Sequence, residues 1–162
     1  MIAPRVIPVM IGQMALSSEP GSVLVTYSLG SCIGLTFYDP ALKLGAMAHI
    51  MLPEGPSQPG EEGKYASSCV PLLVSEMERR GASRDRLQVK MAGGARILAL
   101  LGPFNGPDVG SQNKAAVQRI LTSLGLRITG MDCGGHYGRT MSLYVDTGTV
   151  EISTVGMGKR TI

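Results

Sequence analysis

The sequence predicts a single α+β domain over residues 1–162, and three observations carry this prediction. Short strand-like runs gather towards both ends of the chain, two helix-like segments lie between them, and strands do not alternate with helices as they do in a doubly wound sheet. A chain of 162 residues can bury one core, and no linker or internal repeat marks a second domain. Its 44% hydrophobic and 17% charged residues are typical of a folded protein.

The predicted strands are short, rich in apolar or β-favouring residues and bounded by Gly, Pro or Asp. They are residues 23–27, 32–38, 44–52, 87–94, 126–132, 139–146 and 149–155. Asp39-Pro40 and Asp146-Thr147-Gly148 are predicted as turns, the second of them in a hairpin. Residues 53–64, rich in Pro and Gly, are predicted as a loop, and loops of this length in small domains often carry function.

The first predicted helix follows this loop. Ser67 or Ser68 is its expected N-cap, Arg80 is its last residue and Gly81 ends it, with Pro71 in the first turn, where proline is best tolerated. Its apolar face is expected to pack on the sheet and carries Val70, Leu73 and Met77.

The second predicted helix comes after an irregular stretch. Asn113 is its expected N-cap and Gly125 its terminator. Apolar residues at helical spacing predict the face that packs on the core: Ala116, Val117, Ile120, Leu121 and Leu124.

Charge and cysteine content exclude several classes of protein. The net charge of +3 is small and dispersed, and no basic stripe with interleaved aromatic residues indicates nucleic-acid binding. Three cysteines at irregular spacing favour a reducing compartment over a disulfide framework. Pro8 and Gln13 interrupt the apolar N-terminal stretch, so we expect no signal peptide. No run approaches the roughly 18 apolar residues of a membrane span, so we expect a soluble cytoplasmic protein without membrane insertion.

Cys32 and His49, in the segments SLGSC and GAMAHIMLP, are the strongest candidates for chemistry. Cys32 follows a glycine-containing bend, and His49 is a polar residue within an apolar run. If the turn between their strands is centred near Ala41, the numbers of facing residues sum to about 81 or 82, which places Cys32 opposite His49 or Ile50. Because a protonated imidazole favours the thiolate, we expect the pKa of Cys32 to lie below that of an isolated thiol.

Two further features fit nucleophilic catalysis. Thr26, six residues before Cys32, is our candidate for the hydroxyl that orients the imidazole. Backbone N–H groups around Gly30, Ser31 and Cys32 are candidates for an oxyanion hole, since glycine lets the chain bend tightly there. Each residue taken alone also has a structural interpretation: Cys32 as a buried thiol, His49 as a hydrogen-bonded core histidine and Thr26 as an ordinary strand residue.

The segment DCGGHYGR holds Cys133 and His136 at a C-x-x-H spacing, which is half of a zinc site. Cys32 with His49 could supply the other half, but a glycine loop beside the site is the favoured interpretation because no second closely spaced pair exists. The residues around Lys64 fail the phosphate-loop pattern, and no dinucleotide-binding fingerprint follows a strand. We expect neither a metal nor a cofactor.

Six segments occur in a characteristic order between about Arg5 and Val155: VTYSLGSCIGLTFYDP, GAMAHIMLP, GKYA, MAGGA, VGSQN and DCGGHYGR. In this order and spacing the chain resembles the chemoreceptor glutamine deamidase (CheD) family of bacterial chemotaxis. The resemblance implies a catalytic cysteine, histidine and threonine, which match Cys32, His49 and Thr26. It also implies a central β-sandwich of mostly antiparallel strands with flanking helices. Cys133 and His136 are not required by the family pattern, and a second thiol near the site could form a disulfide with Cys32.

The resemblance implies a reaction and partners as well. Glutamine side chains on the cytoplasmic helices of methyl-accepting chemoreceptors would be hydrolysed to glutamate through a cysteine thioester. A chemotaxis phosphatase of the CheC type is an implied binding partner. The alternative is that the protein is a regulatory binding module for such a phosphatase, with little activity of its own. The 53–64 loop, just after the His49 strand, is our candidate for receptor contact.

Overall fold

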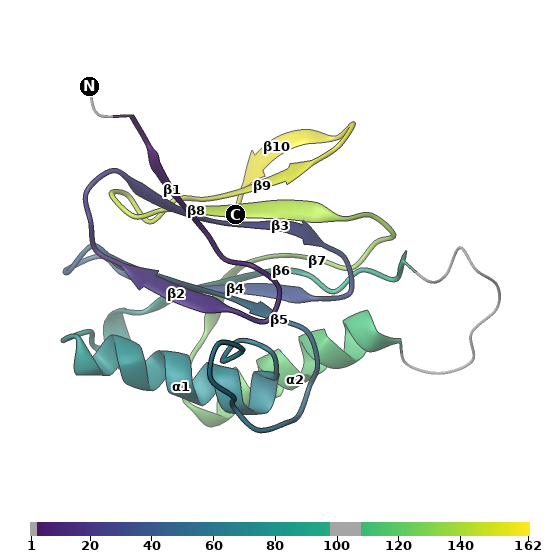
Figure 1. The fold of residues 1–162 in the computed structure, drawn as a ribbon, viewed down its shortest axis with the longest axis horizontal. Coiled ribbons are helices and arrows are strands. Elements are labelled where there is room, and N and C mark those ends of the chain that lie inside the picture. Colours follow the sequence, from purple (N-terminus) through teal and green to yellow (C-terminus); the bar gives the residue numbers. More distant parts are fainter. Residues whose placement is uncertain (1–2, 98–107) are drawn as a thin grey trace.

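The computed structural model describes residues 3–97 and 108–162, which form two five-stranded sheets and two α-helices (Figure 1). The first sheet has the order β1 (Arg5–Pro8), β3 (Ser22–Leu29), β8 (Arg139–Tyr144), β9 (Val150–Thr154) and β10 (Gly158–Thr161). The second has the order β2 (Met14–Ser17), β5 (Leu44–Ile50), β4 (Ile33–Asp39), β6 (Gln88–Gly93) and β7 (Ile128–Cys133). The helices are α1 (Ala66–Arg79) and α2 (Val109–Ser123), and Arg84–Arg86 form a short 3₁₀ turn.

The two sheets stack face to face, and both helices cover the outer face of the second sheet (Figure 1). Within the described ranges, β1 pairs with β3 and β6 with β7 in parallel, and the other strand pairs are antiparallel. The predicted α+β class with a sandwich of mostly antiparallel strands is therefore confirmed.

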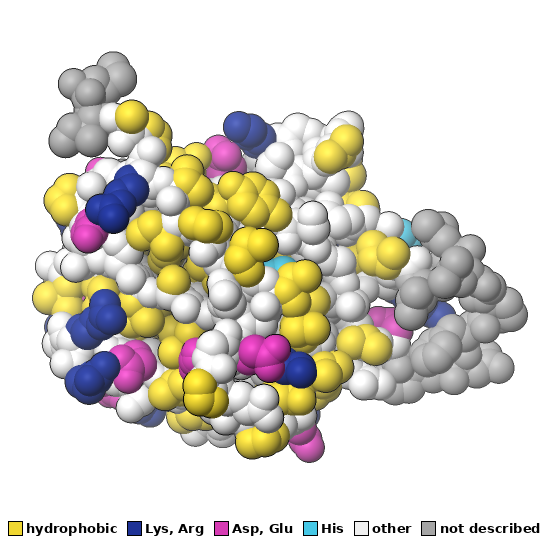
Figure 2. Space-filling view, in the orientation of Figure 1, with side chains coloured by type: hydrophobic (Ala, Val, Ile, Leu, Met, Phe, Trp, Pro, Cys, Tyr) yellow, Lys and Arg dark blue, Asp and Glu magenta, His cyan; other side chains and the backbone are white. Residues whose placement is uncertain are grey.

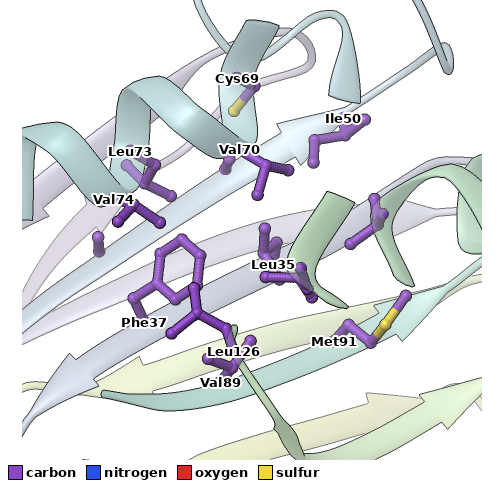
Figure 3. Close-up of a cluster of buried hydrophobic side chains, with 14 of the residues drawn as sticks. Leu35, Phe37, Ile50, Cys69, Val70, Leu73, Val74, Val89, Met91 and Leu126 are labelled. Atoms are coloured by element: carbon purple, nitrogen blue, oxygen red, sulfur yellow. The ribbon is translucent and has the colours of Figure 1, made fainter. Parts of the chain in front are cut away.

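Two hydrophobic layers hold these sheets and helices together. In the layer between α1 and the second sheet, Val70, Leu73 and Val74 lie against Leu35 and Phe37 of β4 (Figure 3). The second layer fills the space between the sheets, and its buried side chains include Leu24, Leu29, Met47, Met141 and Leu143. Strands β4 and β5 are buried along their whole lengths because both of their faces are covered. They therefore hold side chains such as His49 away from solvent.

The helices end where the sequence predicts but begin earlier. Gly81 and Gly125 follow their C-termini with φ of +98° and +74°, a conformation that glycine adopts without strain. The expected caps are wrong. The helix α1 starts at Ala66, so Pro71 is not in its first turn. The N-cap of α2 is Asp108, five residues before the predicted Asn113; its Oδ1 accepts a 2.9 Å hydrogen bond from Ser111 N–H, and the helix starts at Val109.

All seven predicted strands exist, with shifts at their ends, and the turn at 146–148 joins β8 to β9. The sequence-based assignment missed β1, β2 and β10, which have four residues each and too little alternation to be recognised. Residues 53–64 are irregular, as predicted. Most of the irregular stretch expected before the second helix falls at 98–107, outside the described residues. None of the described helices is long and apolar enough to cross a membrane.

Candidate active site

Thr26 and His49 come from two strands, and Cys32 comes from the bend that leads into a third. Thr26 lies on β3 of the first sheet and His49 on β5 of the second, and both side chains are buried. Cys32 lies in the bend just before β4 and is partly buried. Its side chain packs against the hydrophobic layer between the sheets. The three predicted site residues therefore enter the same space.

A hydrogen bond of 2.7 Å between Thr26 Oγ1 and His49 Nδ1 joins the two sheets. The Thr26 hydroxyl has one proton, which it donates to the Val9 carbonyl at 2.7 Å. The hydroxyl therefore accepts from Nδ1–H, so the neutral imidazole keeps a lone pair on Nε2. His49 Nε2 is buried and has no hydrogen-bond partner in residues 3–97 and 108–162. The ring is thus oriented as a base whose reactive nitrogen is uncommitted.

A β-bulge in β3 follows Thr26 and returns the strand to the sandwich interior at Leu29. The β3–β8 register shifts between Thr26 and Leu29, and Ser28 adopts a left-handed φ of +55°. Thr26 and Leu29 both point into the sandwich, whereas a regular strand would turn residues three apart to opposite faces. Tyr27, on the outside of the bulge, is 50% exposed.

Gly34 lies directly opposite His49 in the β4–β5 pair. A Cβ at this position would lie 2.8 Å from side-chain atoms of Leu29 and Met141 and 3.4 Å from Thr26 Cγ2. The space beside Thr26 is therefore already filled, and a side chain opposite the imidazole would require Leu29 and Met141 to move.

The predicted register of the β4–β5 hairpin is wrong by one to two residues. Ile33 pairs with Ile50 and Gly34 with His49, because the turn occupies the four residues 40–43, with Lys43 at φ +48°. The turn centre thus lies beyond Ala41. Cys32 is not directly opposite His49 but diagonal to it. Since Cys32 and Gly34 are two residues apart, Cys32 and His49 still share a sheet face.

The bend that carries Cys32 is anchored at successive carbonyl groups. The carbonyls of Gly30, Ser31 and Cys32 accept hydrogen bonds from Ala95 N–H (2.8 Å), Asn113 Nδ2 (3.0 Å) and Gly94 N–H (2.9 Å). Gly93 has a φ of +105°, and a Cβ on it would lie 2.2 Å from the Cys32 carbonyl oxygen. The glycines of the MAGGA segment therefore allow β6 to approach the bend closely.

Burial sets the charge state of both reactive groups. It raises the pKa of the Cys32 thiol and lowers the pKa of His49 to about 4. Both groups are therefore neutral at neutral pH, and the expectation of a lowered Cys32 pKa is wrong for the resting protein. Burial also raises the pKa of Cys69 to about 12, and that of Cys133 to about 11.

A cavity of about 180 Å³ reaches His49 from the surface. Met10, Ile11 and Tyr27 line it and are 56%, 58% and 50% exposed. In Figure 2, hydrophobic side chains gather across the middle of the face in view, around the visible edge of a histidine. A larger cavity of about 450 Å³ borders the same bend through Ser28 and Gly30. The site therefore has an apolar approach.

The DCGGHYGR segment contributes structure beside the site. Cys133 packs against the helix-side layer, whereas Cys32 packs between the sheets, so the two thiols lie on opposite faces of the second sheet. His136 is exposed, and its Nδ1 lies 3.2 Å from the Arg96 carbonyl. In the described part of the chain, no three His, Cys, Asp or Glu side chains are grouped so that they could hold a metal ion. This arrangement disfavours the zinc and disulfide alternatives.

A family model and curated relatives of this chain carry the same family name. A family model described as CheD chemotactic sensory transduction matches residues 51–154. The probable chemoreceptor glutamine deamidase CheD of Symbiobacterium thermophilum is 44% identical over 152 residues, 92% of each chain. The chemoreceptor glutamine deamidase CheD of Thermotoga maritima is 37% identical over 150 residues, 93% of this chain and 92% of that one.

The chain belongs to the CheD family. The match to the CheD family model begins at Met51 and does not include Thr26, Cys32 or His49. Among solved structures, a crystal structure of a Neisseria meningitidis protein has a TM-score of 0.50 at 12% identity, over 82% of this chain and 63% of that one. This last similarity concerns the fold alone.

Several residues that support the candidate site are not predicted from the sequence. Asn113 was taken for a helix cap, but it contacts the Cys32 bend. Gly34 and Gly93 were not recognised as positions where a side chain would collide with the site. The paired glycines of MAGGA were the available signal, since adjacent glycines often mark a close approach of two backbones.

Proposed function

We propose that this protein deamidates glutamine side chains of chemotaxis receptors, with Cys32 as nucleophile, His49 as general base and acid, and Thr26 as the residue that orients His49. The observation that carries the proposal is the Thr26–His49 hydrogen bond of 2.7 Å. It leaves Nε2 uncommitted, and Cys32 packs on the same face of the second sheet as His49. The names of the CheD relatives supply the substrate class.

The reaction begins with proton transfer from the neutral Cys32 thiol to His49 Nε2 as sulfur attacks the carboxamide carbon. The C–N bond then breaks, and the imidazolium gives its proton to the departing ammonia. The resulting thioester is attacked by a water that His49 deprotonates. Breaking the C–S bond returns the proton to the sulfur and releases glutamate, so the net reaction consumes one water and produces one ammonia.

The N–H groups of Ser31 and Cys32 are the proposed oxyanion hole. Within a trans peptide unit the C=O and N–H point in opposite directions. The carbonyls of Gly30 and Ser31 point into the protein, towards Ala95 and Asn113. The N–H groups of the same two peptide units therefore point the other way and are available to a developing oxyanion.

The proposed substrate is the cytoplasmic helical part of a receptor, which locates the reaction in the cytoplasm. The family resemblance also supports a CheC-type phosphatase as a binding partner. Calorimetric titration of this protein with such a phosphatase tests that partner, and an absence of binding heat counts against it.

The deciding experiment is peptide mass spectrometry on a receptor cytoplasmic fragment incubated with the protein. Wild type is expected to convert particular glutamines to glutamates, whereas Cys32→Ala and His49→Ala should abolish conversion. Thr26→Val should slow it by about 10- to 100-fold, because Nδ1–H loses its acceptor, and Thr26→Ser should restore most of the rate.

Matched controls come from the same chain. Cys133→Ala and His136→Ala remove the other partly accessible thiol and the second histidine and should leave the rate near that of wild type. Conversion that persists in Cys32→Ala would exclude the proposed nucleophile. Folded wild type that converts no glutamine in any of several receptors would favour the regulatory binding module instead.

A further inference from the structure

We propose that Asn113 is a positioning residue that sets the geometry between Cys32 and His49. This inference rests on the proposed function, since it concerns the same site. Asn113 lies in the second turn of α2 with its side chain fully buried. Its Nδ2 donates to the Ser31 carbonyl at 3.0 Å and to the Met51 carbonyl at 2.9 Å. One amide group therefore connects the residue before Cys32 with the residue two beyond His49.

These two bonds form where the β4–β5 ladder ends. Its last pair is Ile33 with Ile50, so Cys32 and Met51 would be the next pair. The Met51 N–H faces the other way and donates to the Lys64 carbonyl at 2.9 Å. The Asn113 NH₂ group spans the opening between the two diverging chains. It therefore links the two segments immediately beyond the last pair of the ladder, next to the residues proposed as nucleophile and base.

The helix that carries Asn113 is itself held close to the bend. A Cβ on Gly110 would lie 2.4 Å from the Ala95 carbonyl oxygen, so α2 packs against the glycine turn after β6 with almost no space between backbones. That turn donates from Gly94 and Ala95 to the carbonyls of Cys32 and Gly30. Helix α2 therefore reaches the Cys32 bend in two ways: through the glycine turn after β6, against which it packs, and through the hydrogen bond from Asn113 to Ser31.

The hydrogen bonds at position 113 require the NH₂ group of an amide, which a residue of the same shape without this group would not supply. Both acceptors are carbonyl oxygens, so only the NH₂ side of Asn113 can face them. Oδ1 is buried and has no partner in residues 3–97 and 108–162. An aspartate would place an oxygen against two carbonyl oxygens, and an alanine would leave both carbonyls unpaired. A residue that merely supplied polarity at the helix surface would be exposed and would not donate two hydrogen bonds to the backbone carbonyls of other segments.

The test compares Asn113→Asp, Asn113→Ala and Asn113→Gln with Val117→Ala. Val117 is also fully buried on α2 but contacts the hydrophobic layer, so its truncation reports the cost of loosening the helix alone. Each folded variant is measured well below its melting temperature. The readouts are kcat and KM on a receptor fragment and the rate and pH profile of Cys32 alkylation by iodoacetamide, assigned by peptide mass spectrometry.

We expect Asn113→Asp and Asn113→Ala to lower kcat by about 10- to 100-fold with little change in KM. The alkylation of Cys32 should slow and follow the pH profile of a thiol without a neighbouring base. Asn113→Gln keeps the donors and should retain more activity than Asn113→Ala. In a His49→Gln background the Asn113→Asp change should have no further effect on alkylation, because it acts through the Cys32–His49 pair.

A folded Asn113→Asp or Asn113→Ala variant with wild-type kcat and alkylation would overturn the proposal, as would a loss no larger than that of Val117→Ala. Should Asn113→Asp and Asn113→Ala both fail to fold, Asn113→Gln decides: normal kcat and alkylation in a destabilised protein would overturn the proposal, and reduced values would support it. Alkylation needs no receptor, so a wild type inactive on receptors would refute the proposed function while the positioning role was still measured.

Discussion

Thr26 orients His49 through a neutral hydrogen bond and places no negative charge beside the imidazole. A carboxylate in this position would stabilise the imidazolium and raise the pKa of the histidine, whereas a hydroxyl whose proton is committed to the Val9 carbonyl acts as a neutral acceptor. Burial therefore dominates, and the pKa of His49 falls to about 4. His49 is a weak base in the resting protein, so in the proposed mechanism proton transfer from Cys32 accompanies attack on the substrate rather than preceding it.

The lowered pKa of His49 predicts a pH-dependent stability. An unfolded histidine titrates near pH 6.5, but His49 in the folded protein titrates near 4. Between these values the unfolded state binds more protons, so the free energy of unfolding should fall as pH decreases from about 6.5 to about 4, by roughly 3 kcal/mol in total. Denaturant titrations at several pH values measure this. His49→Gln should flatten the dependence; a slope in this variant equal to that of wild type would contradict the assignment.

At the scale of elements, two boundaries build the site. The Asp108 cap starts α2 at Val109, so Asn113 falls inside the helix and its amide is available to Ser31 and Met51. Had the helix begun at Asn113, that side chain would be expected to bond the helix's own N–H groups. The other boundary is the end of β6, where the chain turns through glycines against the Cys32 bend.

Gly93→Ala tests the second boundary. The new Cβ would lie 2.2 Å from the Cys32 carbonyl oxygen in a backbone conformation unfavourable to alanine, so we expect a loss of about 2 kcal/mol or more in stability and a lower kcat. Gly125→Ala is the matched control, because it has a similar positive φ but no atom within 4 Å of the added Cβ. It should cost about 1 kcal/mol and leave kcat unchanged. Urea denaturation and receptor deamidation measure both; similar losses of kcat would mean that contact with Cys32 is irrelevant.

At the scale of the whole molecule, polar contacts bridge the sandwich in several places. Thr26 and His49 form one bridge, and Tyr38 on β4 donates a 2.7 Å hydrogen bond to the carbonyl of Val145, just after β8. Another bridge joins Asp132 on β7 to Arg160 on β10 and to Arg139 on β8, whose side chain is fully buried. The hydrogen bond from Arg160, opposed by burial, holds the pKa of Asp132 below its usual value.

Asp132→Asn should therefore destabilise the whole sandwich. The change leaves the buried Arg139 guanidinium without its carboxylate, and breaking a buried pair in this way costs about 3–5 kcal/mol. Glu151→Gln is the control, since it disrupts the exposed 3.8 Å pair with Lys159 and should change stability by less than about 1 kcal/mol. Chemical denaturation measures the difference, and equal effects would show that the bridge does not hold the sheets together.

Local sequence patterns were sufficient for the class of fold, the strands with strong apolar character and the ends of both helices, since glycines such as Gly81 and Gly125 act within a few residues of their own position. Cys32, His49 and Thr26 were also identifiable as candidates from residue type and segment. Only the tertiary structure decided the diagonal placement of Cys32 and His49, because a hairpin register depends on where a turn is centred and one residue changes the face. The same holds for the lowered pKa of His49 and for the bridge made by Asn113. Burial and contacts between Ser31, Met51 and a distant helix depend on residues far apart in the chain, which no local pattern records.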